Sequence, residues 1–488
     1  MSKEVASSVG LEWRINVSDG TSQVLKPTEC RPALSKIWLW LKGLLGGLIV
    51  VVRRFLETAW SIAVAEPRKV VHGLKLGLAI SLVSLLYYIG PLFKGFGGNA
   101  SLWAVMTVVV IYESNVGATL CKCINRTAAT FLAGGLGLGI HWVADHAGEK
   151  AEPVILGISV FLFASAATFS RFMPMVKARF DYGAMIFVLT FSLISVSGYR
   201  EEMLLKFAGS RLSSIATGVS ICILIIVLIC PIWAGSELHR LIHQNMEKLA
   251  DSLDACVAEY FKEDGKTTDS KEDQDYNKKM QGYKCVLNSK AAEESLANSA
   301  RWEPSHGMFN FGHPWKQYLK IGASMRNCAC CIETLTSCLS SEIQAPTCIR
   351  NHVRDVSIRL CSHSTSVLKE LATTIKTMTK SSTIDILVAE MNFAVQELQN
   401  ALNSLPSQFI PPELMTVEGS ADAKGECATE SGMPPLLEVL PLVTAVSLLI
   451  EIAVRIGGVV DAVEDLASLA EFKPARDHKR PQQDKTKP

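Results

Sequence analysis

Three basic side chains stand where the sequence is otherwise apolar, and their charge could act on a passing ion. Lys122 and Arg126 lead into a glycine-rich apolar stretch, and Arg211 stands at the mouth of the longest apolar run. A cation in a membrane-spanning segment costs roughly 2.5–3.5 kcal/mol on insertion scales, so it usually faces a water-filled path or a partner. The sign of these charges predicts a path for an anion.

The composition is that of a membrane region joined to a soluble one. Of the 488 residues, 49% are hydrophobic and 19% are charged, and the mean hydropathy is +0.24, which is high for a wholly soluble protein. The apolar excess lies between Val70 and Gly235. The 48 basic and 47 acidic residues nearly cancel, which argues against a nucleic-acid partner.

Six apolar segments have the hydropathy expected of spanning helices, although several fall short of the roughly 20 residues that cross a bilayer comfortably. They cover Val70–Ile89, Asn99–Tyr112, Ile124–Val143, Val154–Ser170, Tyr182–Ser197 and Leu212–Trp233. We therefore predict an all-α integral membrane protein, with a six-helix transmembrane domain at 67–235 and a helical cytosolic domain at 236–488.

Loop charges predict the orientation in the membrane. One side carries Arg68, Lys122, Arg171, Lys177 and Arg179, whereas the loops of the other side are mixed in charge. Basic loops stay in the cytosol, and six spans return the chain to the side where it started. No secretory signal is evident, since the first 30 residues are polar, so both termini are expected in the cytosol.

The N-terminal extension at 1–66 contains one further apolar stretch, Ile37–Val52. Its aromatic and basic flanks favour an interfacial helix over a seventh span. The C-terminal domain shows helical stripes typical of a core, such as Leu238, Ile242, Leu249 and Leu253. Charged or Pro- and Gly-rich linkers are expected near 262–279 and 407–435.

The last apolar run, Leu436–Val460, contains Glu438, Glu451 and Arg455, which favours a buried bundle helix over another span. The 14 cysteines follow neither a secreted disulfide framework nor a paired zinc pattern, which favours free thiols. The sequence shows no combination of nucleophile and base that would indicate an enzyme. It also shows no glycine-rich phosphate loop that would indicate an ATP-driven pump. Neither a metal nor a cofactor is expected.

Ordered motifs in both halves, from about Glu66 to Phe472, closely resemble the plant aluminium-activated malate transporter family. The motifs are Pro67-Arg68-Lys69 with His72 and Lys75-Leu76-Gly77-Leu78-Ala79, Trp103-Ala104-Val105-Met106-Thr107, Gly117-Ala118-Thr119-Leu120 with Asn125-Arg126, Phe180-Asp181-Tyr182-Gly183 and Trp302-Glu303-Pro304-Ser305-His306-Gly307. The resemblance implies a homodimeric anion channel with six spans per subunit, embedded in the lipid bilayer and carrying malate and inorganic anions.

Carried over by position, Arg126 and Arg211 resemble the pore arginines of that family. Lys122 is a third candidate pore cation and Lys75 a weaker one. The alternative for each is a structural cation that extends along the helix to the lipid headgroups.

Glu303 and His306, in the motif that begins with Trp302, could be mistaken for a metal site. The spacing is not that of HExxH, and Trp302-Glu303-Pro304 followed by glycine favours a rigid turn between helices. We expect a structural or gating role for this motif.

Two other functions stay open. A coupled aromatic or organic acid exporter is possible because fusaric-acid-resistance-type transporters have a broadly similar membrane half, and Glu113 is the one obvious candidate for a proton relay. A membrane-anchored scaffold fits poorly, because basic residues lie inside the spans. The overall resemblance favours the plasma membrane, with the vacuolar membrane as the alternative.

Direct aluminium activation is not expected. At Lys94, Glu202 and Lys206, the resemblance places acidic residues in aluminium-responsive members, so that this chain keeps one carboxylate and reverses two charges. A hard trivalent cation requires several oxygen ligands, and like charges oppose its binding.

Overall fold

The structure is a computed structural model that describes residues 14–15, 23–24, 33–89, 100–148, 150–196, 201–262, 277–339, 347–408 and 436–474. The chain divides into two units, residues 1–74 and 75–488. Apart from two strands of two residues each, the described elements are helices, which confirms the predicted all-α class.

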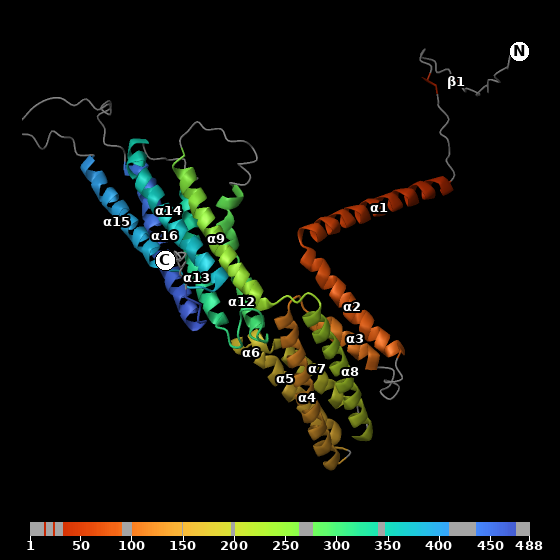
Figure 1. Cartoon of the computed structure of the whole chain (residues 1–488). Coiled ribbons are helices and arrows are strands. Elements are labelled where there is room, and N and C mark those ends of the chain that lie inside the picture. Colours follow the sequence, from red (N-terminus) through yellow and green to blue (C-terminus); the bar gives the residue numbers. More distant parts are fainter. Residues whose placement is uncertain are drawn as a thin grey trace, which may run out of the picture. The chain divides into compact units, whose positions relative to one another are not determined.

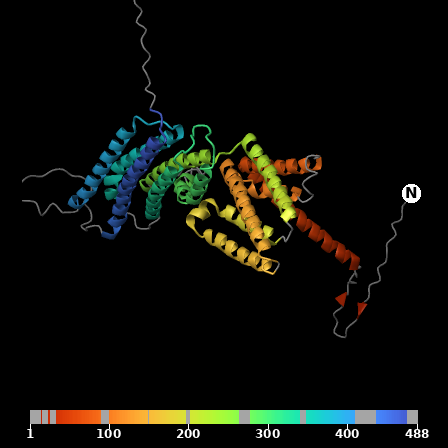
Figure 2. The same cartoon turned by 90° about the horizontal axis from the view of Figure 1, so that it is seen from below.

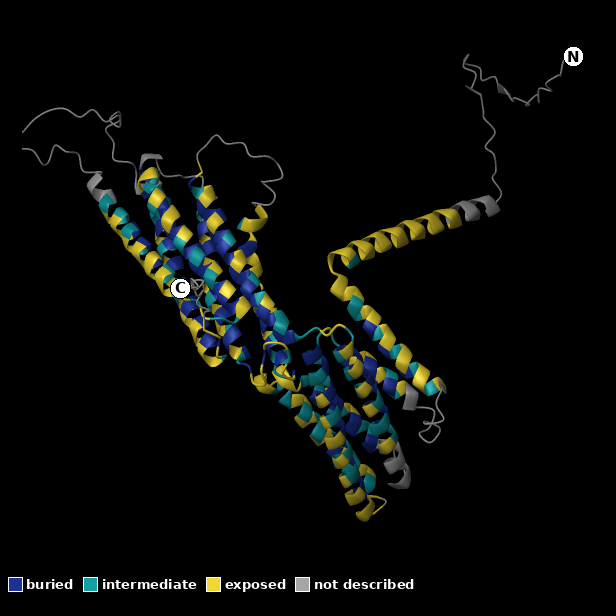
Figure 3. Ribbon diagram, viewed as in Figure 1, coloured by how far each residue is buried: buried dark blue, intermediate teal, exposed yellow. Residues whose placement is uncertain are grey.

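The first unit holds the strands β1 (Arg14–Ile15) and β2 (Gln23–Val24), which pair antiparallel, and the long helix α1 (Ala33–Ala65). The segment predicted to lie at the interface is only the middle of α1. The helix ends before Pro67, since a proline disfavours helical geometry in the residue that precedes it. Pro67 then begins α2 (Pro67–Ile89). The described side chains of α1 are almost all exposed (Figure 3).

Each of the other predicted spans also falls on a helix: α3 (Ala100–Ile111), α4 (Val116–His146), α5 (Glu152–Ser170), α7 (Asp181–Val196) and α8 (Glu201–Leu228), with the short α6 (Pro174–Arg179) before α7. By length and composition α2, α4, α5 and α8 could each cross a membrane, whereas α3 and α7 are shorter apolar helices. The protein is therefore an integral membrane protein of helical type.

Two of these helices have bounds that differ from those of the predicted spans. Helix α4 begins at Val116 rather than Ile124, because the Asn115 side chain accepts a hydrogen bond from the amide of Ala118 (2.8 Å) and caps the helix there. Lys122 therefore lies inside α4 and not in a loop. Helix α8 begins at Glu201 rather than Leu212 and ends at Leu228, just before Cys230 (φ 41°) and Pro231.

The apolar helices pack closely around α4. Figures 1 and 2 show α4 beside α5 and α7, and α4 also contacts α8, which packs on α3. Gly137 allows α7 to approach, since a Cβ atom there would lie 2.8 Å from Cγ2 of Ile194. Small residues at such crossings let helices pack by van der Waals contact where lipid offers no hydrophobic gain.

The second half of unit 75–488 is a helical bundle with its own core. Its helices are α9 (Ala234–Tyr260), α11 (Gly282–Leu287), α12 (Lys290–Ala300), α13 (Trp315–Leu339), α14 (Thr347–Thr377), α15 (Ile384–Gln408) and α16 (Leu436–Leu469). The predicted stripe of Leu238, Ile242, Leu249 and Leu253 is buried. The inward faces of these helices appear dark blue in Figure 3.

Helix α16 is long and apolar enough to cross a membrane, yet it belongs to the bundle. Leu442, Val446 and Ile456 are fully buried in the bundle core. Arg455 also donates from one guanidinium nitrogen to the carbonyl of Asn327 on α13 (2.9 Å). This is the bundle position expected from the sequence. The predicted linkers fall mostly on residues 263–276 and 409–435, which lie outside the described residues.

Candidate functional site

Arg126 lies in the third turn of α4 and is 6% exposed. One terminal nitrogen donates to the hydroxyl of Tyr182 on α7 (3.0 Å), and the Nε of Arg126 has no hydrogen-bond partner in the described part of the chain. Within the described residues it forms no ion pair with a carboxylate. The charge is thus held inside the protein and is only partly compensated there.

Arg211 is 8% exposed and lies about three turns into α8, because α8 begins before the apolar run. Its guanidinium carbon stands over the ring of Trp103 on α3, 3.5 Å from the ring centroid. Its charge also interacts unfavourably with that of Arg126. Both arginines are therefore buried within the protein.

A cavity of about 350 Å³ opens between α4, α7 and α8. Arg211 lines it together with Thr130 and Thr190, and the rest of its wall is apolar or glycine. Thr130 follows Arg126 by one helical turn, and its buried hydroxyl has no hydrogen-bond partner among the described residues. A cavity with one cation and two hydroxyl groups can receive an anion that has shed part of its water.

Further polar groups continue along the buried face of α4. Arg126, Thr130, Gly137 and His141 recur at helical spacing and are all buried. The Nε2 of His141 has no hydrogen-bond partner within the described residues. Sequence reasoning missed Thr130 and His141, although the helical spacing from Arg126 was a usable signal.

The two lysines predicted for the pore have structural partners. Lys122 forms an ion pair with Glu113, and its ammonium lies 5.6 Å from the ring centroid of Tyr182. Lys75 is buried and donates to the carbonyl of Cys230 (2.7 Å), just beyond the C-terminus of α8. A cation is favourable at a helix C-terminus. Neither lysine is among the residues that line the cavity beside Arg211.

Glu303 joins the apolar helices to the bundle. One carboxylate oxygen accepts from the amides of Gly117 (3.1 Å) and Ala234 (2.6 Å), and the other accepts from the amide of Gly235 (3.0 Å). These amides belong to the first turns of α4 and α9, where a carboxylate is favoured by the helix dipole. The two helices therefore share one cap, which the sequence spacing could not reveal.

The glycines at this joint allow close approach of the segments around Glu303. A Cβ atom on Gly117 would collide with the carbonyl of Ser299, and one on Gly235 would lie 2.7 Å from Cζ2 of Trp315. Burial raises the pKa of Glu303, while the three amides and His306 oppose this shift.

The rest of the motif lies in the connection between α12 and α13. The His306 ring stacks on Trp233 with a centroid distance of 4.1 Å, and Trp302 makes an edge contact with Phe180. Pro304 accepts a hydrogen bond from Nδ1 of His306 (2.9 Å) through its carbonyl. The motif thus brings rings from the apolar region and from the bundle into contact.

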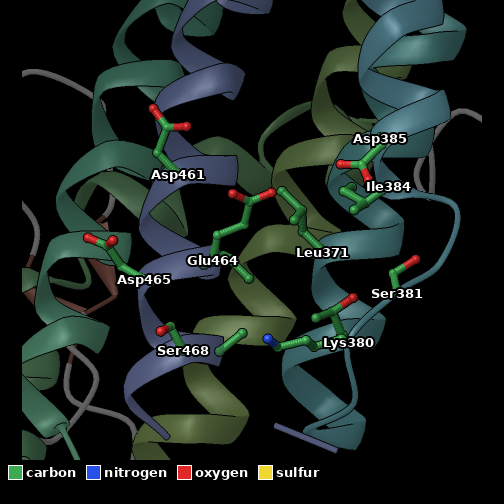
Figure 4. A pocket seen from close by; sticks show the side chains of 12 residues that line it. Leu371, Lys380, Ser381, Ile384, Asp385, Asp461, Glu464, Asp465 and Ser468 are labelled. Atoms are coloured by element: carbon green, nitrogen blue, oxygen red, sulfur yellow. The ribbon is translucent and has the colours of Figure 1, made fainter. Parts of the chain in front are cut away.

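A larger cleft of about 670 Å³ lies in the bundle between α14, α15 and α16. Figure 4 shows its acidic wall, with Asp461, Glu464 and Asp465 on α16 and Asp385 on α15. Lys380 is the one basic residue among its described lining residues. The sign of this field is wrong for an anion. Of the residues considered for aluminium, Lys94 lies outside the described residues, as do the side chains of Glu202 and Lys206.

An all-α membrane protein with two buried arginines, one of them lining a cavity between its apolar helices, has the features expected of an anion transport protein. Comparisons with known proteins all point to one family. The family model of the aluminium activated malate transporter matches residues 60–431. The chain is 55% identical to aluminum-activated malate transporter 10 of Arabidopsis thaliana over 477 residues, which covers 95% of each chain.

Two further relatives agree. Aluminum-activated malate transporter 2 of Arabidopsis thaliana is 43% identical over 86% of this chain and 79% of its own. Aluminum-activated malate transporter 1 of Triticum aestivum is 39% identical over 90% and 91%. The chain therefore belongs to the aluminium-activated malate transporter family.

Proposed function

We propose that this protein conducts malate and other anions across a plant membrane along a path between α4, α7 and α8. The observation that carries the proposal is the pair of buried guanidinium groups, Arg126 on α4 and Arg211 on α8, whose charges repel each other. The relatives named as malate transporters support malate as the cargo.

The arrangement suits passage better than storage of an anion. A dicarboxylate that enters the apolar region loses hydration, and the two cations offset part of that loss. Binding must stay weak enough for the ion to leave, so sparse charge is an advantage. The cavity supplies one arginine, Arg211, and two threonine hydroxyls in an otherwise apolar wall, and Arg126 lies one helical turn before Thr130, which meets this requirement.

A coupled exporter is the alternative. Glu113, the candidate for its proton relay, forms an ion pair with Lys122 and is partly exposed, which favours a structural role over a relay. Currents recorded with malate, nitrate, sulfate and chloride exchanged in turn test the proposal. With malate speciation held constant, the reversal potential should follow the anion gradient alone. A systematic shift with an imposed proton gradient would support coupling.

We further propose a homodimer in the plasma membrane with both termini in the cytosol. The basic side chains of Arg68, Arg171, Lys177 and Arg179 support this orientation. A subunit with several short apolar helices is small for a dicarboxylate path, which supports a two-fold assembly. Native mass measurement in detergent should give twice the mass of the chain, and a conducting monomer would refute the dimer.

Glu303 is proposed to couple the bundle to the path. A movement of α9 would act on α4 through their shared carboxylate cap, and Arg126 lies in α4. Glu303→Gln keeps an acceptor oxygen but weakens the charged cap, so we expect altered activation of the current with folding retained. Ser305→Ala, in the same connection, is the control. Unchanged gating in a properly delivered Glu303→Gln protein would contradict the coupling.

A further inference from the structure

A second cationic site lies outside the path, beside the joint made by Glu303. It is a pocket of about 430 Å³ between the end of α6, the connection that follows α12 and the start of α13. Its cations come from three separate elements: Arg179 from α6, Arg301 from the connection and Lys316 from α13. Arg126 and Arg211 do not line it.

The positive charges of this pocket are not balanced within the described residues. The side chains of Arg179, Arg301 and Lys316 form no ion pair or hydrogen bond there. The one carboxylate among the described lining residues, Glu303, is already held by three backbone amides. Burial lowers the pKa of Arg301, and repulsion from Arg179 lowers it further. An arginine nonetheless keeps its charge at neutral pH, so a bound anion would relieve this repulsion.

The wall of the pocket is held in shape before any ligand binds. His306 and Phe309 exchange two backbone hydrogen bonds (3.1 and 3.0 Å) and close a tight turn. Gly307 (φ 55°) and Gly312 (φ 87°) supply left-handed backbone that other residues adopt reluctantly. The Phe309 and Trp315 rings, 5.1 Å apart, form a buried floor. Little ordering would therefore be required on binding.

We propose that this pocket binds the phosphate group of a small ligand. Two guanidinium groups can each present paired N–H donors to phosphate oxygens, and a lysine ammonium adds a point charge. The volume exceeds that of phosphate alone and lies within the range of small-molecule sites. The ligand is a soluble phosphate compound or the headgroup of a phospholipid. A headgroup is included because Arg179 ends a short helix that lies in sequence between two apolar helices.

A ligand in this pocket would affect the contacts around Glu303 rather than the proposed anion path. Glu303, Pro304 and His306 line it, and Glu303 caps both α4 and α9. A ligand that draws Arg179 and Arg301 together would hold the connection between α12 and α13 against α6. Phosphate binding would thereby stabilise one arrangement of the joint.

The test uses the full-length protein in nanodiscs, with binding measured calorimetrically and by the thermal unfolding midpoint. One arm adds inorganic phosphate to nanodiscs of phosphatidylcholine. The other replaces a minor fraction of that lipid with phosphatidylinositol phosphate. The variant is Arg179→Gln with Arg301→Gln. The matched control is Lys177→Gln with Lys320→Gln, which removes the same charge from α6 and α13 at exposed residues that do not line the pocket.

We expect binding in at least one arm, weakened about tenfold or more in the arginine variant by the loss of charge-assisted bonds, and unchanged in the control. A signal in the lipid arm alone identifies a headgroup, and a signal in the phosphate arm identifies a soluble ligand. Absence of binding in both arms, an equal loss in the control, or equal binding of malate at the same residues would overturn the proposal. Arg126→Ala should bind phosphate normally, so failure of the path assignment is distinguished from failure of this site.

Discussion

The two regions of unit 75–488 bury charge in opposite ways. In the bundle, the fully buried Glu293 accepts from Arg326 (2.6 Å) and from the hydroxyl of Ser289 (2.6 Å). Gly322 leaves room for that carboxylate, since a Cβ atom there would collide with it. Among the apolar helices, Arg126 has a hydroxyl partner and no described carboxylate.

This difference separates structural from functional burial of a charge. Removing one member of a neutralised buried pair leaves an uncompensated charge and is strongly destabilising. Removing a buried cation that has no counter-charge removes a desolvation cost and breaks no ion pair. What is lost is the attraction of that cation for an anion. An arginine therefore stabilises the fold in the bundle, whereas among the apolar helices we propose that an arginine acts on the passing ion.

The largest effect on stability is expected at Arg326. Arg326→Ala leaves Glu293 buried without its cation, so the free energy of unfolding of the protein should fall by about 3–5 kcal/mol. Arg359→Ala, at the exposed pair with Glu397, is the control and should cost less than about 1 kcal/mol. Denaturant unfolding in detergent measures both. Equal losses of unfolding free energy in the two variants would show that the buried pair of Arg326 and Glu293 contributes no more than an exposed pair.

The largest effect on transport is expected at the path arginines. Arg126→Ala and Arg211→Ala should each reduce malate current on the order of tenfold, equivalent to about 1.4 kcal/mol, while the protein stays folded and reaches the membrane. Chloride current should suffer less, because a dianion loses more Coulomb stabilisation. Arg171→Ala, which breaks the partly buried pair with Asp181, serves as a charge-matched control. Unchanged malate conductance in both path variants would remove these arginines from the path.

A third test concerns polar groups that the bundle buries uncharged. Tyr318 bonds through its hydroxyl to Nδ1 of His239 (3.0 Å) and Nε2 of His313 (3.2 Å). Burial lowers the pKa of each histidine to about 4, from 6.5 when unfolded. As the pH falls, the histidines of the unfolded chain bind protons before those of the folded protein do. The contribution of the two neutral histidines to the free energy of unfolding is therefore fully present above pH 6.5 and is lost as the pH falls towards 4.

This loss can reach on the order of 3 kcal/mol for each histidine. The thermal midpoint should therefore drop between pH 6.5 and 4, and His313→Gln should flatten that dependence. His363→Gln, at a partly exposed site paired with Glu390, should leave it unchanged. A flat profile in the unmodified protein would show that the histidines are not buried neutral.

The smallest effect is expected from aluminium. With Lys94 and Lys206 in place, added aluminium should change the current little at acidic external pH, because cations repel a trivalent ion. Lys94→Asp with Lys206→Asp should create a response if the new carboxylates converge near Glu202. Current with and without the ion measures this. Strong activation of the unmodified protein would place the trigger elsewhere.

Local pattern was enough to predict most helices. The stripe of Leu238, Ile242 and Leu249 predicted a buried face, and that face is buried. The charges at Glu451 and Arg455 predicted a bundle helix where hydropathy alone indicates a span. Boundaries were less secure. The start of α4 depended on the Asn115 cap, and α8 extended back through charged residues that a hydropathy argument excludes.

By itself, the sequence determined the helical class, the apolar region and the family, since these depend on residue type and spacing along the chain. It also supplied the hypothesis that Arg126 and Arg211 act on the anion, which stays a prediction. Only the tertiary structure decided that Lys122 has Glu113 as a partner, that Glu303 caps two helices at once, and that Arg179, Arg301 and Lys316 share a pocket. The physical reason is distance along the chain. Glu303 lies 186 residues from Gly117 and 69 from Ala234, and no local propensity reports contacts of that separation.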